Sequence, residues 1–163
     1  MPSIEKNKLD QFRKGEIKFT QLFQFHGNQI ASLLLCGYNF FNHGRLQEAK
    51  SIFEGLRLLD PDIPYVNCVL GAIYQRLGKT DLALLRYTHA IDLFPQDIVA
   101  LTNRAEIYLS EGKFLDAAID LKKVIEFDPE SKNPAANRAR MLAAITSKSL
   151  QLINKPGEIN AGK

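Results

Sequence analysis

Hydrophobic and small residues of this chain recur in three successive stretches with a spacing of 34 residues. When the three stretches are aligned, each set of equivalent positions forms a column, and the clearest apolar column holds an aromatic ring at Phe40, Tyr74 and Tyr108. Small and helix-stopping residues follow the same period in four further columns: Gly37, Gly71 and Ala105; Gly44, Gly78 and Gly112; Ala49, Ala83 and Ala117; and Pro61, Pro95 and Pro129. No insertion breaks the register, so the chain is predicted to contain three copies of one supersecondary unit.

Each copy is predicted to be a pair of helices. In the second copy, Pro64–Leu77 begins with a proline, which suits a first helical turn because its missing N–H would lack a partner there. Gly78 can adopt the left-handed conformation that ends this helix, and Thr80 is the expected N-cap of a second helix, Thr80–Leu93. One such hairpin cannot bury its own apolar face, so the copies are expected to stack into an all-α superhelix.

The small columns have a packing reason. Gly71 and its equivalents let the two helices of a hairpin approach closely, and bulky residues fill the remaining space. These expected core residues are Phe40, Phe53, Tyr74, Tyr87, Tyr108 and Leu121.

The spacing divides the chain into six expected segments. They are an N-terminal helical segment (1–29), three repeats (30–63, 64–97 and 98–131), a C-terminal capping helix (132–152) and a disordered tail (153–163). The capping helix is predicted from apolar residues at helical spacing, namely Ala135, Ala139, Leu142 and Ile145. The N-terminal segment carries an apolar stripe that includes Phe12, Phe19, Leu22 and Phe23, which we expect to pack on the first repeat or on another chain.

Composition excludes several classes of function. The net charge is only +3 and its basic surplus lies in the two flanks, which argues against nucleic-acid binding. No run approaches the roughly 18 apolar residues of a membrane span, and the N-terminus lacks a signal core, so a cytoplasmic protein is expected. Cys36 and Cys68 are expected to be buried, reduced thiols.

No catalytic constellation is found, so the chain is not expected to be an enzyme or to carry a cofactor. His26, His43 and His89 lie far from one another and from any metal-ligand spacing, and no metal site is expected. Asp116 and Asp120 share one helix face and are expected to face solvent.

The fixed period and the order of its columns are the tetratricopeptide signature. Stacked hairpins of this kind curve so that their first helices line a concave groove, the expected site for an extended peptide. The predicted peptide-binding residues are Leu34, Tyr38, Phe41, Tyr65, Cys68, Ala72, Gln75, Val99, Thr102, Glu106 and Leu109.

The groove lacks the charges used by one well-known class of tetratricopeptide domain. Co-chaperones that grip the acidic C-termini of heat-shock proteins use Lys, Asn and Arg at five positions. The matching residues here are Leu34, Tyr38, Val69, Val99 and Asn103. The predicted ligand is therefore a peptide with spaced aliphatic side chains; alternatively, Leu34 and Tyr38 are simply covered by the N-terminal segment.

Residues 30–127 resemble the tetratricopeptide (class II) chaperones of bacterial type III secretion. The resemblance is carried by the acidic link LLDPD, by LGAIYQRLGKTDLAL in the second repeat, and by three repeats with flanking helices. It implies a cytoplasmic chaperone that holds extended segments of translocator proteins in the groove and forms a homodimer through residues 1–29. Because the chain also follows the general repeat consensus closely, a tetratricopeptide adaptor that docks a partner within a stable assembly is the alternative.

Overall fold

The computed structural model describes residues 6–17, 21 and 27–154, and within these residues the regular structure is entirely helical. A short helix α1 (Lys6–Arg13) precedes three helical hairpins and a long last helix. The hairpins are α3 (Gly27–Asn42) with α4 (Leu46–Leu59), α5 (Pro64–Arg76) with α6 (Thr80–Leu93), and α7 (Ile98–Ser110) with α8 (Phe114–Phe127), followed by α9 (Pro134–Asn154). The predicted all-α class is confirmed.

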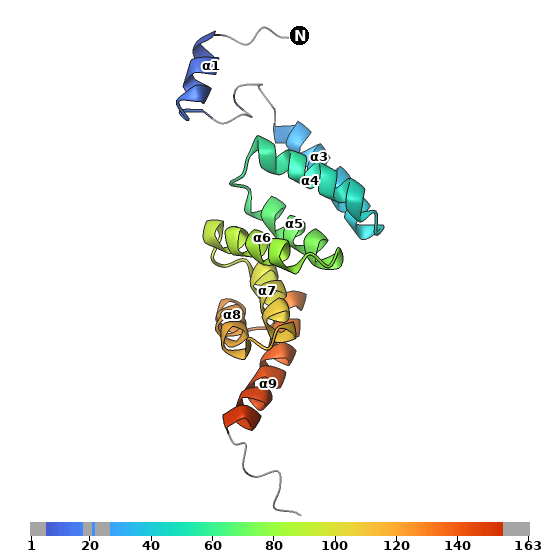
Figure 1. Ribbon diagram of the computed structural model, residues 1–163, viewed down its shortest axis with the longest axis vertical. Coiled ribbons are helices and arrows are strands. Elements are labelled where there is room, and N and C mark those ends of the chain that lie inside the picture. Colours follow the sequence, from blue (N-terminus) through green and yellow to red (C-terminus); the bar gives the residue numbers. More distant parts are fainter. Residues whose placement is uncertain (1–5, 18–20, 22–26, 155–163) are drawn as a thin grey trace, which may run out of the picture.

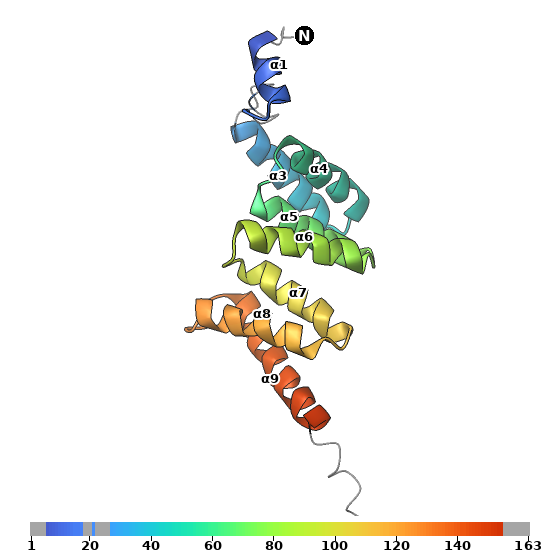
Figure 2. The ribbon, with the colours of Figure 1, turned by 60° about the vertical axis from the view of Figure 1, so that its left-hand side comes forward.

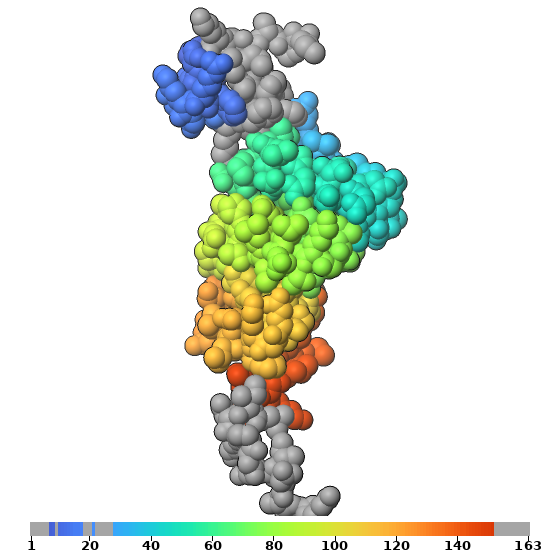
Figure 3. All heavy atoms as spheres, in the orientation of Figure 1, coloured from blue at the N-terminus to red at the C-terminus, as the bar shows by residue number. Residues whose placement is uncertain are grey.

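The hairpins follow one another along the long axis of the molecule (Figures 1 and 2). The second helix of each hairpin packs on the next helix along the chain, so α4 contacts α5, α6 contacts α7 and α8 contacts α9. The filled-atom view shows an unbroken column from α3 to α9 (Figure 3). No helix in the described part of the chain is long and apolar enough to cross a membrane.

The turn inside each hairpin is made by a glycine. Gly44, Gly78 and Gly112 have φ angles of 72°, 69° and 73°, in the left-handed region that side chains with a Cβ atom disfavour. Gly78 follows the C-cap residue of α5, as predicted, and Pro64 starts that helix. The prediction that Thr80 caps α6 is wrong: the N-cap is Lys79, which makes no side-chain cap hydrogen bond.

The core lies between the helices of each hairpin and between successive hairpins. Phe53, Tyr87 and Leu121 are fully buried, and Tyr74 is nearly so, as the repeat pattern predicted. Phe40 and Tyr108 pack against this core while remaining partly exposed. The cysteines differ from the prediction, since Cys68 is buried but Cys36 is exposed on α3.

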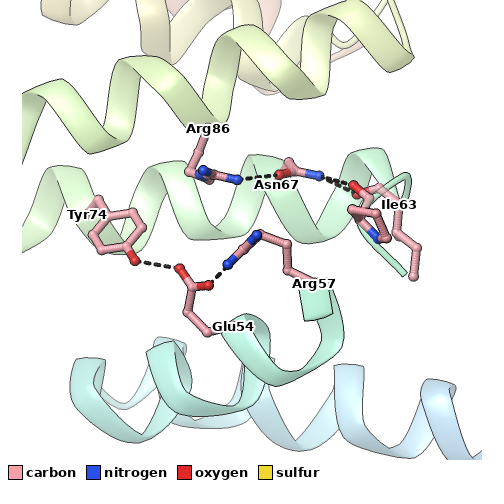
Figure 4. A network of polar contacts seen from close by, with 7 residues as sticks. Glu54, Arg57, Ile63, Asn67, Tyr74 and Arg86 are labelled. Atoms are coloured by element: carbon pink, nitrogen blue, oxygen red, sulfur yellow. Dashed lines mark hydrogen bonds and ion pairs between the residues drawn. The ribbon is translucent and has the colours of Figure 1, made fainter. Parts of the chain in front are cut away.

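Hairpins one and two are also joined by a polar network (Figure 4). The Tyr74 hydroxyl donates to Oε1 of Glu54, and Arg57 Nε donates to Oε2 at 2.7 Å. Burial raises the pKa of the Glu54 carboxyl, but the hydrogen bonds from Tyr74 and Arg57 outweigh it and hold this pKa below its ordinary value. Burial and the neighbouring carboxylate raise the pKa of Tyr74 to about 12.

The third hairpin contains a buried ion pair that the sequence pattern did not predict. Arg104 on α7 donates from Nε and Nη2 to the two oxygens of Asp120 on α8, at 2.8 Å each, and from Nη1 to the Thr88 hydroxyl on α6 at 3.0 Å. The side chain of Asp120 is only 2% exposed. The expectation that Asp120 faces solvent is therefore wrong, because a cation from the neighbouring helix draws it inward; Asp116 is exposed as expected.

Helix α9 covers the end of the third hairpin by packing on both α7 and α8. Ala136 and Ala139 are fully buried there, and Leu142 packs against the core. Ile145, predicted to belong to the same covering face, is instead exposed. The predicted tail beyond residue 154 and the N-terminal residues Phe19, Leu22 and Phe23 lie outside the described residues.

Candidate functional site: a groove along the first helices of the hairpins

A groove of about 760 Å³ runs from the first hairpin to α9. The first helices of the hairpins, α3, α5 and α7, supply most of its lining. The lining residues are Tyr38, Phe41, Tyr65, Cys68, Val69, Ala72, Gln75, Arg76, Tyr87, Asp97, Val99, Asn103, Glu106, Pro134, Ala135 and Arg138.

The end of the groove formed by α3 and α5 is aromatic. Tyr38 and Tyr65 are 41% and 45% exposed, so their rings offer apolar surface to a ligand. Tyr38 and Phe41 pack against each other with ring centroids 6.3 Å apart. The guanidinium carbon of Arg76 lies 4.2 Å from the centre of the Phe41 ring, a cation–π contact that holds the wall of the groove in place.

The middle of the groove is shaped by Tyr87, which belongs to α6 rather than to a first helix. Its ring reaches the groove past Gly71, and its hydroxyl donates to Oε1 of Gln75 at 2.8 Å. Beside it lies the Cys68 thiol, whose pKa is raised by burial and further raised by the neighbouring Asp97 carboxylate. The thiol is therefore protonated at neutral pH and contributes a small apolar surface to the groove.

The far end of the groove is polar and is closed by α9. Arg138 on α9 donates to Oδ1 of Asn103, and its Nε lies 3.2 Å from Oε1 of Glu106, both on α7. Pro134 and Ala135 complete this wall. The groove therefore changes along its length from exposed aromatic rings to a paired set of charges.

Eight of the eleven predicted peptide-binding residues line this groove: Tyr38, Phe41, Tyr65, Cys68, Ala72, Gln75, Val99 and Glu106. Leu34 and Leu109 lie outside its lining and pack against the core. Thr102 is fully buried, so the prediction that it contacts a ligand is wrong. Its hydroxyl donates to the carbonyl oxygens of Ile98 at 2.7 Å and Ala135 at 3.4 Å, because α9 covers this part of α7.

Sequence reasoning also missed the contribution of α9. The signal was present, because Ala139 lies 34 residues after Ala105, and Arg138 lies 34 residues after Arg104. Helix α9 thus occupies the place of the first helix of a fourth repeat. The register does not identify its groove-lining residues, because Arg138 lines the groove whereas its equivalent Arg104 pairs with Asp120 on α8.

The described residues give no sign of a chemical centre. No group of three or more His, Cys, Asp or Glu side chains among them could hold a metal ion. His43 sits on the surface with Nδ1 2.7 Å from the carbonyl oxygen of Asn39, and His89 is half-buried on α6. His26 lies outside the described residues. The geometry is that of a binding surface.

Comparison with known proteins supports the repeat assignment. A family model described as tetratricopeptide repeat matches residues 98–131. This chain has a tetratricopeptide-repeat fold.

The most informative relatives come from type III secretion. The low calcium response locus protein H of Yersinia pseudotuberculosis is 25% identical over 143 residues, covering 86% of this chain and 85% of the relative. A type III secretion complex from Aeromonas hydrophila has a TM-score of 0.78 at 21% identity, covering 90% of this chain and 99% of the matched chain.

The type III secretion translocator chaperone SycD of Yersinia enterocolitica has a TM-score of 0.73 at 19% identity, over 78% of this chain and 89% of SycD. A further SycD structure contains a peptide of the translocator YopD. The resemblance expected from the sequence is confirmed by these comparisons.

Proposed function

We propose that this protein is a cytoplasmic type III secretion chaperone that holds extended segments of translocator proteins in its groove. The similarity to low calcium response locus protein H extends over nearly the whole of both chains, which sets it apart from relatives that share only a short stretch of repeats. The structural likeness to SycD supports the same assignment, since SycD is a translocator chaperone that has been solved in complex with a peptide of the translocator YopD.

The observation that carries the proposal is the aromatic end of the groove. Exposed tyrosine rings side by side in a concave surface lose unfavourable contact with water when an apolar side chain covers them. Tyr38, Phe41 and Tyr65 supply such a surface on two adjacent helices. An extended peptide fits it well, because alternate side chains can enter the groove while the peptide backbone stays solvated.

The groove is poorly suited to the acidic peptides that other tetratricopeptide domains bind. A domain of the protein Spaghetti, solved with an HSP90 peptide, shares the fold with a TM-score of 0.69 at 21% identity. In this chain the positions expected to grip terminal carboxylates hold Leu34, Tyr38 and Val99 among others, so these positions carry none of the positive charge that grips an acidic peptide.

Binding alone is sufficient for the proposed activity. A translocator segment seated in the groove has its apolar side chains covered and is kept from aggregating or assembling early. No nucleotide or catalytic group is needed, because the client is held by burial of apolar surface and is released when export removes it from the equilibrium. We therefore propose a non-enzymatic protein.

Co-production with candidate clients tests this function. Candidate translocator proteins from the same organism are produced alone and together with this protein, and the soluble fraction of each is measured. The proposal predicts a client that aggregates alone, becomes soluble with the parent protein, and aggregates again with the Tyr38→Ala, Tyr65→Ala double variant. Leu58→Ala, an exposed leucine on α4 outside the groove, is the matched control and should solubilise the client fully.

The alternative of a structural adaptor gives a different result in the same experiment. An adaptor's partner is soluble on its own and joins a lasting complex, so its soluble fraction would not change with co-production. Such an outcome, with binding still lost in the double variant, would replace the chaperone proposal by the adaptor.

A further inference from the structure

The junction between the second and third hairpins departs from the repeat pattern at one position. Asp60, Phe94 and Asp128 are related by the 34-residue period, and each follows the second helix of its hairpin. Asp60 accepts a hydrogen bond from the backbone N–H of Asp62 at 3.1 Å, and Asp128 accepts two from the backbone beyond it. Phe94 has no side-chain oxygen to do this, and it is 49% exposed. A turn-stabilising carboxylate is replaced here by exposed apolar surface.

The Phe94 ring forms one wall of a pocket of about 440 Å³ at the N-terminal ends of α5 and α7. Pro64, Tyr65 and Val99 supply further apolar walls. Tyr65, Asp97 and Val99 line the main groove as well. This edge pocket, defined by Pro64, Tyr65, Phe94, Asp97 and Val99, is therefore a lateral continuation of the groove.

A negative charge marks the border between the edge pocket and the groove. Oδ1 of Asp97 caps α7 by accepting the backbone N–H of Ala100 at 2.9 Å, and its other neighbour is the Cys68 thiol. Neither partner is a cation. Glu106, the other carboxylate of the groove, differs because it is already paired with Arg138. An incoming cation thus has a place beside Asp97 that it lacks beside Glu106.

We propose that the edge pocket is a further subsite for the translocator polypeptide, which crosses the N-terminal ends of α5 and α7 on leaving the groove. The subsite takes an aliphatic or aromatic side chain against Phe94 and an adjacent Lys or Arg beside Asp97. Continuity with the groove fixes the occupant as the same polypeptide, and the Asp97 carboxylate fixes the sign of its charge. The inference rests on the proposed function, since it extends the path of the same ligand.

Two synthetic fluorescein-labelled peptides test this subsite by fluorescence anisotropy with the full-length protein. Both begin with alternating leucine and serine to fill the groove, and they end in isoleucine–lysine pairs or in isoleucine–glutamate pairs. The parent protein should bind the lysine peptide about three- to fivefold more tightly, as expected for a partly exposed ion pair. Asp97→Asn should abolish this preference while keeping the helix cap, because asparagine caps helices well.

Removal of the aromatic wall gives the second readout. Phe94→Asn, which places a turn-favouring side chain where the other hairpins have Asp, should weaken both peptides about five- to tenfold. Phe127→Asn is the matched control, since Phe127 is another partly exposed phenylalanine and lies outside the lining of both groove and pocket. Its affinity for both peptides should equal that of the parent.

A variant in the main groove distinguishes the possible failures. If Tyr38→Ala weakens both peptides while Asp97→Asn and Phe94→Asn bind them as the parent does, the edge-pocket subsite is overturned and the groove stands. Equal affinity of the parent for the two peptides would also overturn it. If the parent binds neither peptide, the groove proposal fails together with the subsite. Should Phe94→Asn unfold, the charge preference and its loss in Asp97→Asn decide alone.

Discussion

Gly71 on α5 and Tyr87 on α6 are in such close contact that a Cβ atom at position 71 would lie 2.5 Å from Cε1 of the tyrosine ring. Real Cβ atoms do not approach other heavy atoms so closely. The ring itself is fully buried and reaches the floor of the groove, where its hydroxyl meets Gln75. One missing side chain therefore allows the hairpin to close and places the buried Tyr87 ring directly beneath the groove.

The first prediction concerns this contact. Gly71→Leu should lower the free energy of unfolding by about 1–3 kcal/mol or more, because the added side chain overlaps a ring that cannot move aside within the packed hairpin. Gly55→Ala is the control, since Gly55 lies in α4 with no neighbouring atom within 4 Å of an added Cβ. Its expected effect is a gain of up to about 1 kcal/mol from helix propensity. Urea denaturation of both variants measures the difference, and a Gly71→Leu protein as stable as the parent would contradict the described packing.

The buried ion pair gives the second prediction. Asp120→Asn leaves the Arg104 guanidinium, only 14% exposed, without its counter-charge and should cost about 3 kcal/mol in the free energy of unfolding. The exposed pair Lys122–Glu126, separated by 3.8 Å, serves as the comparison, and Glu126→Gln should cost less than about 0.5 kcal/mol. Thermal unfolding followed by circular dichroism compares the stability lost in Asp120→Asn with that lost in Glu126→Gln. Equal losses of stability would mean that Asp120 is as solvated as Glu126.

The third prediction comes from the lowered pKa of Glu54. A carboxyl whose pKa is lower in the folded protein binds fewer protons there than in the unfolded chain. Its stabilising effect is complete above the ordinary glutamate value of about 4.3 and is lost as pH falls through the lower, folded value. Glu54→Gln should therefore lower the melting temperature at pH 7 and reduce the fall in melting temperature on acidification. If the melting temperatures of the parent and of Glu54→Gln fell equally as the pH was lowered, Tyr74 and Arg57 would not favour the ionised form of Glu54.

The N-terminal segment carries the fourth prediction. Phe12, Phe19, Leu22 and Phe23 form an apolar stripe in the sequence, and each large side chain left in water costs roughly 1.5–3 kcal/mol. We expect a second copy of the chain to cover it, which predicts a dimer in sedimentation. Deletion of residues 1–26, which leaves α3 intact, should then give a monomer with unchanged affinity for the client.

A fold-back of this segment over the groove is the rival. It predicts a monomer before and after deletion, and tighter client binding in the shortened protein. None of the described residues 6–17 lines the groove. A full-length protein that sediments as a monomer at tens of micromolar would contradict the dimer.

The period of the sequence was enough to predict the hairpins, because their turns and close contacts depend on residues within one repeat. Gly78 forms the turn of the second hairpin, and Gly71 contacts Tyr87 within the same hairpin. The surroundings of a repeat position depend instead on the helices that pack beside that repeat. Cys68 and Thr102 are equivalent by the period, yet Cys68 lines the groove whereas Thr102 lies under α9. No rule within the repeat distinguishes them.

Charges were harder to place than apolar residues for a related reason. The spacing of Asp116 and Asp120 gives their direction on α8 but says nothing of a cation on the facing helix. Arg104 and Asp120 meet across the hairpin, 16 residues apart. Arg138 likewise reaches Asn103 and Glu106 only because α9 packs against α7. The polar end of the groove thus arises from tertiary packing that the repeat pattern does not encode.

The affinity of the groove for its translocator is the most direct test of the central proposal. The client identified by co-production is titrated by calorimetry into the parent, Tyr38→Ala and Tyr65→Ala, with Leu58→Ala as the control. Loss of either ring should weaken binding by about 1–3 kcal/mol, roughly five- to 150-fold, with the fold intact by circular dichroism. Parent-like affinity in both tyrosine variants would contradict the account and place the client elsewhere on the molecule.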